Sequence, residues 1–124
     1  MEVPILKQGS YLIASVQSAL TDADLRQLQE RLAGMVSRHR SRGVVVDLAA
    51  MDVMDSFASR TLRDTAHMLR LRGAATVIVG IQPEVAFAMV QLGMNLEGIA
   101  TALDLEDGLA LLDERVGGGP GHVR

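Results

Sequence analysis

The chain has 124 residues, which is enough for one domain with its own core. Almost half of the residues are apolar and only 2% are aromatic, so global disorder is excluded and the core must be built from aliphatic side chains. The formal net charge of −3 is spread along the chain, which argues against nucleic acid or an anionic membrane as a partner. Cysteine is absent, which removes disulfides, thiolate metal sites and cysteine nucleophiles.

The first third of the chain predicts a hairpin, a helix and a buried strand. Residues 3–7 and 11–16 are short β-prone runs separated by a Gly-containing turn. The run Leu20-Thr21-Asp22 supplies an N-cap, apolar residues follow at helical spacing from Leu25 to Val36, and we expect Gly43 to close this helical segment. Residues 43–48 form a continuous β-branched run, which is typical of a strand buried on both faces.

The remainder alternates helices with strands. Asp55 or Ser56 caps a second helix that Gly73 ends, and residues 75–80 repeat the buried-strand pattern. Pro83 begins a third helix, a short edge strand follows at 99–101, and Asp104 caps a last helix. The inner face of the second helix is predicted to consist of Phe57, Thr61, Leu62, Thr65, Met68 and Leu69.

This order predicts an α/β fold: a single domain with a mixed, mostly parallel sheet of four or five strands and about four helices. The hairpin supplies the antiparallel element. We expect the domain to span residues 3–115 and a flexible Gly-rich tail to span 116–124. Because the first residues lack a signal-peptide pattern and no apolar stretch approaches the roughly 20 residues needed to cross a bilayer, we expect a cytoplasmic protein.

No pattern of a catalytic, cofactor or metal site is found in the sequence. The three histidines lack metal-binding spacing, and neither a phosphate loop nor a nucleophile elbow occurs. Polar residues gather in one segment, 47–60, with three carboxylates and two serines. This segment joins the carboxyl end of a buried strand to a helix start, which is where ligands and chemistry usually sit in open α/β sheets.

Two interpretations of that segment compete. Asp and Ser are favoured helix caps without any further function. A serine at a helix start also suits phosphorylation, because free backbone N–H groups and the positive end of the helix dipole would receive the dianion. Arg60 and Arg63 follow about one and two turns further on.

The residues at this segment resemble a known family. The run 44–48 followed by Met54-Asp55-Ser56-Phe57 resembles the phospho-acceptor region of STAS domains, the sulphate-transporter and anti-sigma-antagonist family. Supporting segments lie at 4–7, 80–83 and 96–106, so the resemblance spans roughly residues 3–115. Sporulation-type antagonists usually carry Gly after the phosphoserine, whereas this chain has Phe57, which favours the branch of the family that builds the bacterial stressosome.

The resemblance implies a non-catalytic scaffold or antagonist without cofactor or metal. It would sequester a switch serine/threonine kinase, release it on phosphorylation of Ser56, and so regulate the general stress response governed by a sigma factor. The implied partners are that kinase and a longer STAS-domain co-antagonist with an N-terminal sensory domain, with self-association into a large complex. The predicted partner-binding residues of the switch loop are Asp52, Met54, Asp55, Phe57, Ser59 and Arg60.

Alternatives stay open at this stage. A receiver-like domain would use Asp52 or Asp55 as phospho-acceptor, but the first strands lack the acidic pair such a domain needs and no lysine follows Lys7. A nucleotide-binding STAS domain is compatible with the fold but has no residue signature. The sequence does not decide whether Ser59, Thr61 or Thr65 also accepts phosphate. Met51, Val53, Met54 and Phe57 are expected either to remain partly exposed for a partner or to turn inward.

Overall fold

The computed structural model describes residues 2–116, which form one five-stranded sheet and four helices. The strands are β1 (Ile5–Gln8), β2 (Tyr11–Ser15), β3 (Gly43–Asp47), β4 (Ala75–Val79) and β5 (Ala100–Ala102), and the helices are α1 (Asp22–His39), α2 (Ser56–Leu71), α3 (Pro83–Gln91) and α4 (Leu105–Val116). Neighbouring strands follow chain order; β1 is antiparallel to β2 and all other pairs are parallel. The predicted fold class is confirmed. Residue 116 ends α4, and the remainder of the expected tail lies outside the described residues.

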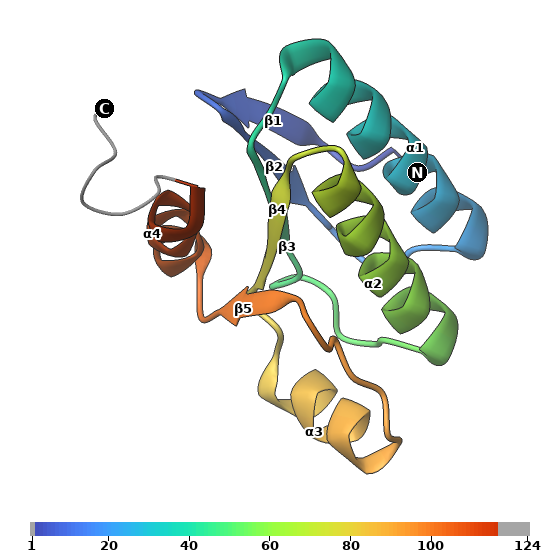
Figure 1. Cartoon of the computed structure of the whole chain (residues 1–124). Helices are drawn as coiled ribbons and strands as arrows, with labels where there is room; N and C mark the ends of the chain where they lie inside the picture. The colour runs from blue at the N-terminus through green and yellow to red at the C-terminus, as the bar shows by residue number, and fades with distance from the viewer. Residues whose placement is uncertain (1, 117–124) are drawn as a thin grey trace.

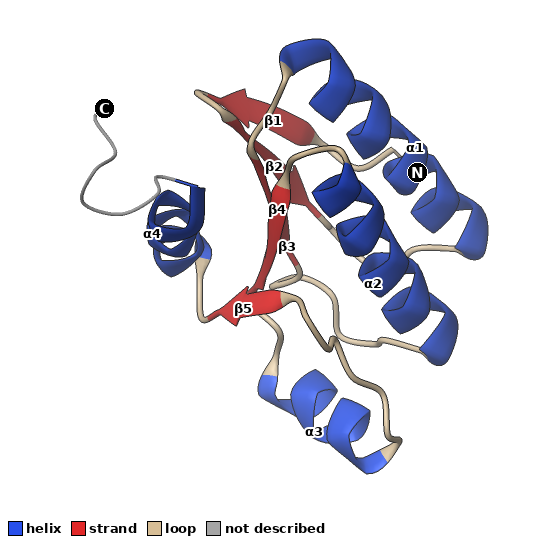
Figure 2. Cartoon of the chain, viewed as in Figure 1, coloured by secondary structure: helices blue, strands red, loops and turns tan. Residues whose placement is uncertain are grey.

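The sheet carries helices on both faces. Figure 1 shows α1 and α2 side by side on one face and α4 on the other, while α3 lies apart from them near β5. Figure 2 shows that the strands form the layer between these helices. Because side chains alternate along a strand, Val44 and Val46 of β3 join the core under α1 and α2, whereas Val45 joins the smaller core under α4.

The start of α1 is as predicted and its end is not. Thr21 and Asp24 form a capping box, in which each side chain accepts a hydrogen bond from the other residue's backbone N–H. The helix ends at His39, before Gly43, because Arg40 adopts a left-handed conformation (φ 51°) and its N–H donates to the carbonyl of Val36. The prediction that Gly43 closes this helix was therefore wrong.

Gly43 is the first residue of β3, as the predicted strand at 43–48 has it. A Cβ at this position would lie 2.9 Å from side-chain atoms of Leu112 and Tyr11. The missing side chain thus lets α4 and β2 pack closely against the start of β3.

The buried face of α2 is broader than predicted. Leu62, Thr65 and Leu69 are buried as expected, whereas Phe57, Thr61 and Met68 are only half-buried. The additional buried positions are the small residues Ala58, Ser59 and Ala66. α2 contacts both α1 and β4, and a helix packed against two neighbours buries a broader face than one packed against a sheet alone.

A glycine in α4 sets how closely this helix approaches the sheet. We expect Gly108→Ala to lower the free energy of unfolding by about 1–3 kcal/mol, because the new Cβ would lie 2.6 Å from Cγ1 of Val79. Gly34 in α1 has open space around it, so Gly34→Ala is expected to raise this free energy by about 0.5–1 kcal/mol. Urea unfolding followed by circular dichroism measures both; equal stabilisation by the two substitutions would contradict the proposed packing of α4.

Candidate functional site

The predicted switch loop lies within residues 47–60, which run from the end of β3 through the connection at 48–55 into the first turns of α2, at the carboxyl ends of the parallel strands. Its first residues are held to the sheet. The N–H of Leu48 donates to the carbonyl of Val79 at 2.9 Å, and a carboxylate oxygen of Asp47 accepts from the N–H of Ala49 at 2.9 Å. The side-chain amide of Gln82 donates to the carbonyl of Ala49 at 2.7 Å. The loop therefore starts from a fixed position tied to the β4–α3 connection.

The apolar residues of the switch loop divide between core and surface. Met51 and Met54 are buried, Phe57 is half-buried against the main core, and Val53 is 62% exposed. We expected these four side chains either to stay partly exposed or to turn inward. Val53 and Phe57 are at least partly exposed, whereas Met51 and Met54 turn inward. Met54 was predicted to bind a partner but is buried. Its thioether side chain packs in the aliphatic core and so anchors the loop.

Asp55, not Ser56, caps α2. A carboxylate oxygen of Asp55 accepts from the N–H of Ala58 at 2.8 Å. Ser56 is the first residue of the helix, and its side chain is exposed. The N–H groups in the first turn of a helix have no carbonyl partner within the helix. The Ser56 hydroxyl thus lies at the positive end of the helix dipole without taking part in the cap.

The other hydroxyls of α2 lie in a different environment. Ser59, a predicted partner-binding residue, is 3% exposed, and its side chain is therefore not available at the surface. Thr65 is buried, donates to the carbonyl of Thr61 at 2.6 Å and accepts from the side-chain amide of Gln29 at 3.0 Å. Thr61 is half-buried. Phosphorylation of Ser59 or Thr65 would require α2 to separate from the residues that cover these hydroxyls.

One arginine that the sequence did not indicate, Arg26, lies beside the first turn of α2. The guanidinium of Arg26, on α1, lies 5.4 Å from the centre of the Phe57 ring. Arg60 is exposed one turn beyond Ser56, and the Nε of Arg63 lies 3.9 Å from a carboxylate oxygen of Asp64. Arg26 was missed because nothing in its local sequence indicates the contact, which arises only when α1 and α2 pack together.

The remaining switch-loop carboxylate is exposed. Asp52 lies on the surface between the buried Met51 and the exposed Val53. Within residues 2–116, no three side chains of the metal-ligating types come together. Over the same stretch of chain, no helix has the length and apolar character needed to cross a membrane.

Comparison with known proteins identifies the class to which this fold and loop belong. The STAS domain family model matches residues 2–108, so the chain belongs to the STAS domain family. The chain is 31% identical over 84 residues to the RsbT co-antagonist protein RsbRA of Bacillus subtilis, an alignment that covers 68% of this chain and 31% of RsbRA. The chain thus spans about a third of the length of that relative.

Solved structures give a second comparison. RsbS of Moorella thermoacetica, in a serine-to-glutamate variant, matches with a TM-score of 0.78 and 34% identity, covering 91% of this chain and 96% of that one. A chain of the stressosome, described as a signal integration and transduction hub, matches with a TM-score of 0.74 and 34% identity, covering 90% and 97%. The unphosphorylated anti-sigma factor antagonist SpoIIAA shares the fold, with a TM-score of 0.67 and 11% identity.

The cap of α2 offers a direct test of the site's local structure. We expect Asp55→Ala to lower the free energy of unfolding by about 1 kcal/mol, because the N–H of Ala58 loses its acceptor. Asp55→Asn keeps an oxygen acceptor and should retain most of the stability. Asp52→Ala is the matched control, since Asp52 is exposed and does not cap the helix. If denaturant unfolding gives Asp55→Ala and Asp52→Ala the same midpoint, the capping role is contradicted.

Proposed function

We propose that this chain is a non-catalytic stressosome scaffold of the RsbS type. In this proposal it assembles with a longer STAS-domain co-antagonist, sequesters a switch serine kinase, and releases that kinase when Ser56 is phosphorylated. The output is a general stress response governed by a sigma factor. The similarity to RsbS and to a stressosome chain over nine-tenths of the sequence supports this function.

The observation that carries the proposal is the position of Ser56. Its side chain is exposed at the first residue of α2, while the neighbouring Asp55 caps the helix. A kinase can therefore reach the hydroxyl without breaking a structural hydrogen bond of the cap. Ser59 and Thr65, the competing hydroxyls, are 3% and 4% exposed.

A phosphate at Ser56 would act on a partner more than on the fold. The helix dipole and free N–H groups at the start of α2 favour a dianion, and Arg60 lies one turn further on. The domain is therefore expected to stay folded when phosphorylated. A partner covering the loop would instead meet about −1.5 to −2 added charge with its hydration shell, which disfavours the interface.

Assembly is supported by apolar side chains that the domain leaves on its surface. Phe87, Val90 and Leu92 of the α3 region are 65–79% exposed, and Leu103 after β5 is 80% exposed. Contiguous exposed apolar side chains mark interaction sites on soluble domains. The relatives named as RsbT co-antagonists are about three times longer than the stretch this chain matches, and we propose a protein of that kind, with an N-terminal sensory domain, as the scaffold partner.

Phosphorylation of Ser56 is the first functional prediction. Incubation with the cognate switch kinase should place one phosphate on Ser56, in an acid-stable serine ester, as mapped by intact mass and fragment ions. Ser56→Ala should abolish this incorporation, and Ser10→Ala, an exposed serine at the opposite end of the sheet, should leave it unchanged. Undiminished labelling of Ser56→Ala, or an acid-labile label on aspartate, would contradict the proposal.

Release of the kinase from the phosphorylated chain is the second functional prediction. Ser56→Asp is expected to weaken capture of the kinase by about tenfold or less, because aspartate supplies one charge and a smaller hydration shell than phosphate. Ser56→Ala should keep the kinase captured with wild-type affinity. Ser10→Asp adds the same charge at the far end of the sheet and serves as the matched control. In a pull-down titration, equal kinase binding by the phosphoprotein and the unmodified chain would refute release by charge.

A further inference from the structure

An apolar groove of about 410 Å³ lies between α3 and β5. Its lining comes from α3, from the segments on either side of this helix, and from the end of β5. The apolar side chains that the groove presents include Ile81, Met89, Val90, Met94, Leu96 and Leu103. Because an apolar cavity of about 150 Å³ already accepts a benzene-sized molecule, this groove has room for an aliphatic side chain of a partner.

The groove lies in an acidic part of the surface. Glu84, Glu97 and Asp104 are exposed, and each is within two positions of a lining residue. The sequence has no lysine, arginine or histidine between Arg72 and Arg115, so α3 and β5 carry no positive side chain that would balance these carboxylates. Two copies that met groove to groove would bring their carboxylates together, which like-charge repulsion disfavours. The surface that fits the groove is therefore apolar and surrounded by positive charge.

The chain presents such a surface at the end of α2. Leu71, the last residue of this helix, is 87% exposed. Arg72 follows it, and its guanidinium donates to the hydroxyl of Ser37 at 2.6 Å, which places the ends of α1 and α2 next to each other. Arg38 and Arg40 at the end of α1 are exposed and add positive charge beside the leucine. We call Leu71 with these three arginines the α2-end patch.

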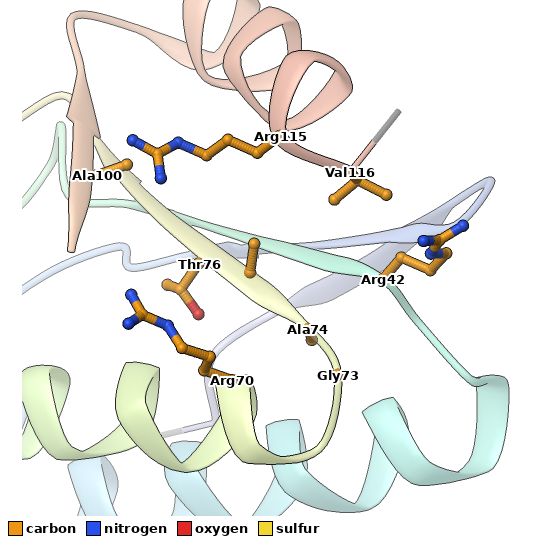
Figure 3. A pocket seen from close by; sticks show the side chains of 9 residues that line it. Arg42, Arg70, Gly73, Ala74, Thr76, Ala100, Arg115 and Val116 are labelled. Atoms are coloured by element: carbon orange, nitrogen blue, oxygen red, sulfur yellow. The ribbon is translucent and has the colours of Figure 1, made fainter. Parts of the chain in front are cut away.

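The segments that form the α2-end patch contain no negative side chain. No aspartate or glutamate occurs in residues 31–46 or 65–83. Figure 3 shows this end of the sheet, where Arg42 and Arg70 are directed away from each other, and Arg70 donates to the carbonyl of Gly98 at 2.6 Å. These two arginines are therefore not part of the patch.

The groove and the α2-end patch lie at opposite ends of the domain. Figure 1 shows the last turns of α1 and α2 at one end of the sheet and α3 beyond the other end. One copy can therefore use both surfaces at the same time. Contacts between two different surfaces of one kind of chain are heterologous, and they build rings or extended arrays rather than closed pairs.

We propose that copies of this chain associate head to tail, with Leu71 of one copy inserted into the apolar groove of the next. The arginines of the α2-end patch then face the carboxylates beside the groove, which fixes the orientation of the two copies. This inference rests on the proposed scaffold function and deepens it, because it names the two surfaces through which the chain self-associates.

Sedimentation velocity of the full chain tests this contact. The mean mass of the wild-type chain should rise above that of the monomer at concentrations on the order of several hundred micromolar, since small interfaces bind weakly. Leu71→Asp and Val90→Asp should each weaken self-association at least about tenfold, because each places a charge in an apolar contact. An equimolar mixture of the two variants should regain one contact, between the intact groove of the first and the intact Leu71 of the second, and should stop at the dimer.

Leu6→Asp is the matched control. Leu6 is an exposed apolar residue of β1 outside both surfaces, so this variant should associate like the wild-type chain. The three substituted side chains are exposed, so the midpoints of urea unfolding should be unchanged. Raising sodium chloride from about 0.05 to 0.5 M should weaken the association, because it screens the facing charges.

A wild-type chain that stays monomeric overturns the inference, as does self-association of Leu71→Asp alone. A mixture of Leu71→Asp and Val90→Asp that stays monomeric, or an association that salt leaves unchanged, also overturns it. Assembly with a longer co-antagonist is a separate measurement on the same preparations. A large mixed species formed by a chain that is monomeric alone would overturn the head-to-tail contact and leave the proposed function standing.

Discussion

The structure depends on the anchoring of one loop between a buried strand and a helix. β3 lies between β2 and β4 with both faces covered, so its carboxyl end is fixed, and Leu48 continues the attachment through a hydrogen bond to β4. Met51 and Met54 then tie the loop to the core before Asp55 caps α2. Every feature proposed for Ser56 follows from this anchoring, because it places an exposed hydroxyl at a defined helix end on an otherwise rigid support.

Much of this architecture is predictable from local sequence signals. The strand pattern at 75–80, the helix cap within residues 20–22 and the start of α3 at Pro83 each rest on a few consecutive residues, and the structure confirms them. The end of α1 was mispredicted because Arg40 takes the left-handed position that glycine usually occupies. Gly43 was available as a stop signal in the sequence, but its actual role is to make room for Leu112, which is distant in the chain.

The candidate site was predictable in its position but not in its surroundings. The Asp-Ser pair after a buried strand is visible in the sequence, and so is the choice between two capping residues. Which one caps the helix depends on side-chain geometry that only the structure supplies. The burial of Met54 and Ser59 and the contact of Arg26 with Phe57 depend on how α1 and α2 pack, so no periodicity within a single segment indicates them.

The central claim is that this domain works as part of a scaffold. The most direct measurement is multi-angle light scattering on a mixture of the chain with a longer co-antagonist of the RsbR type at micromolar concentration. We expect one defined large species that contains both proteins and exceeds the mass of either alone. Two species that elute separately, each with its own unassociated mass, would contradict it.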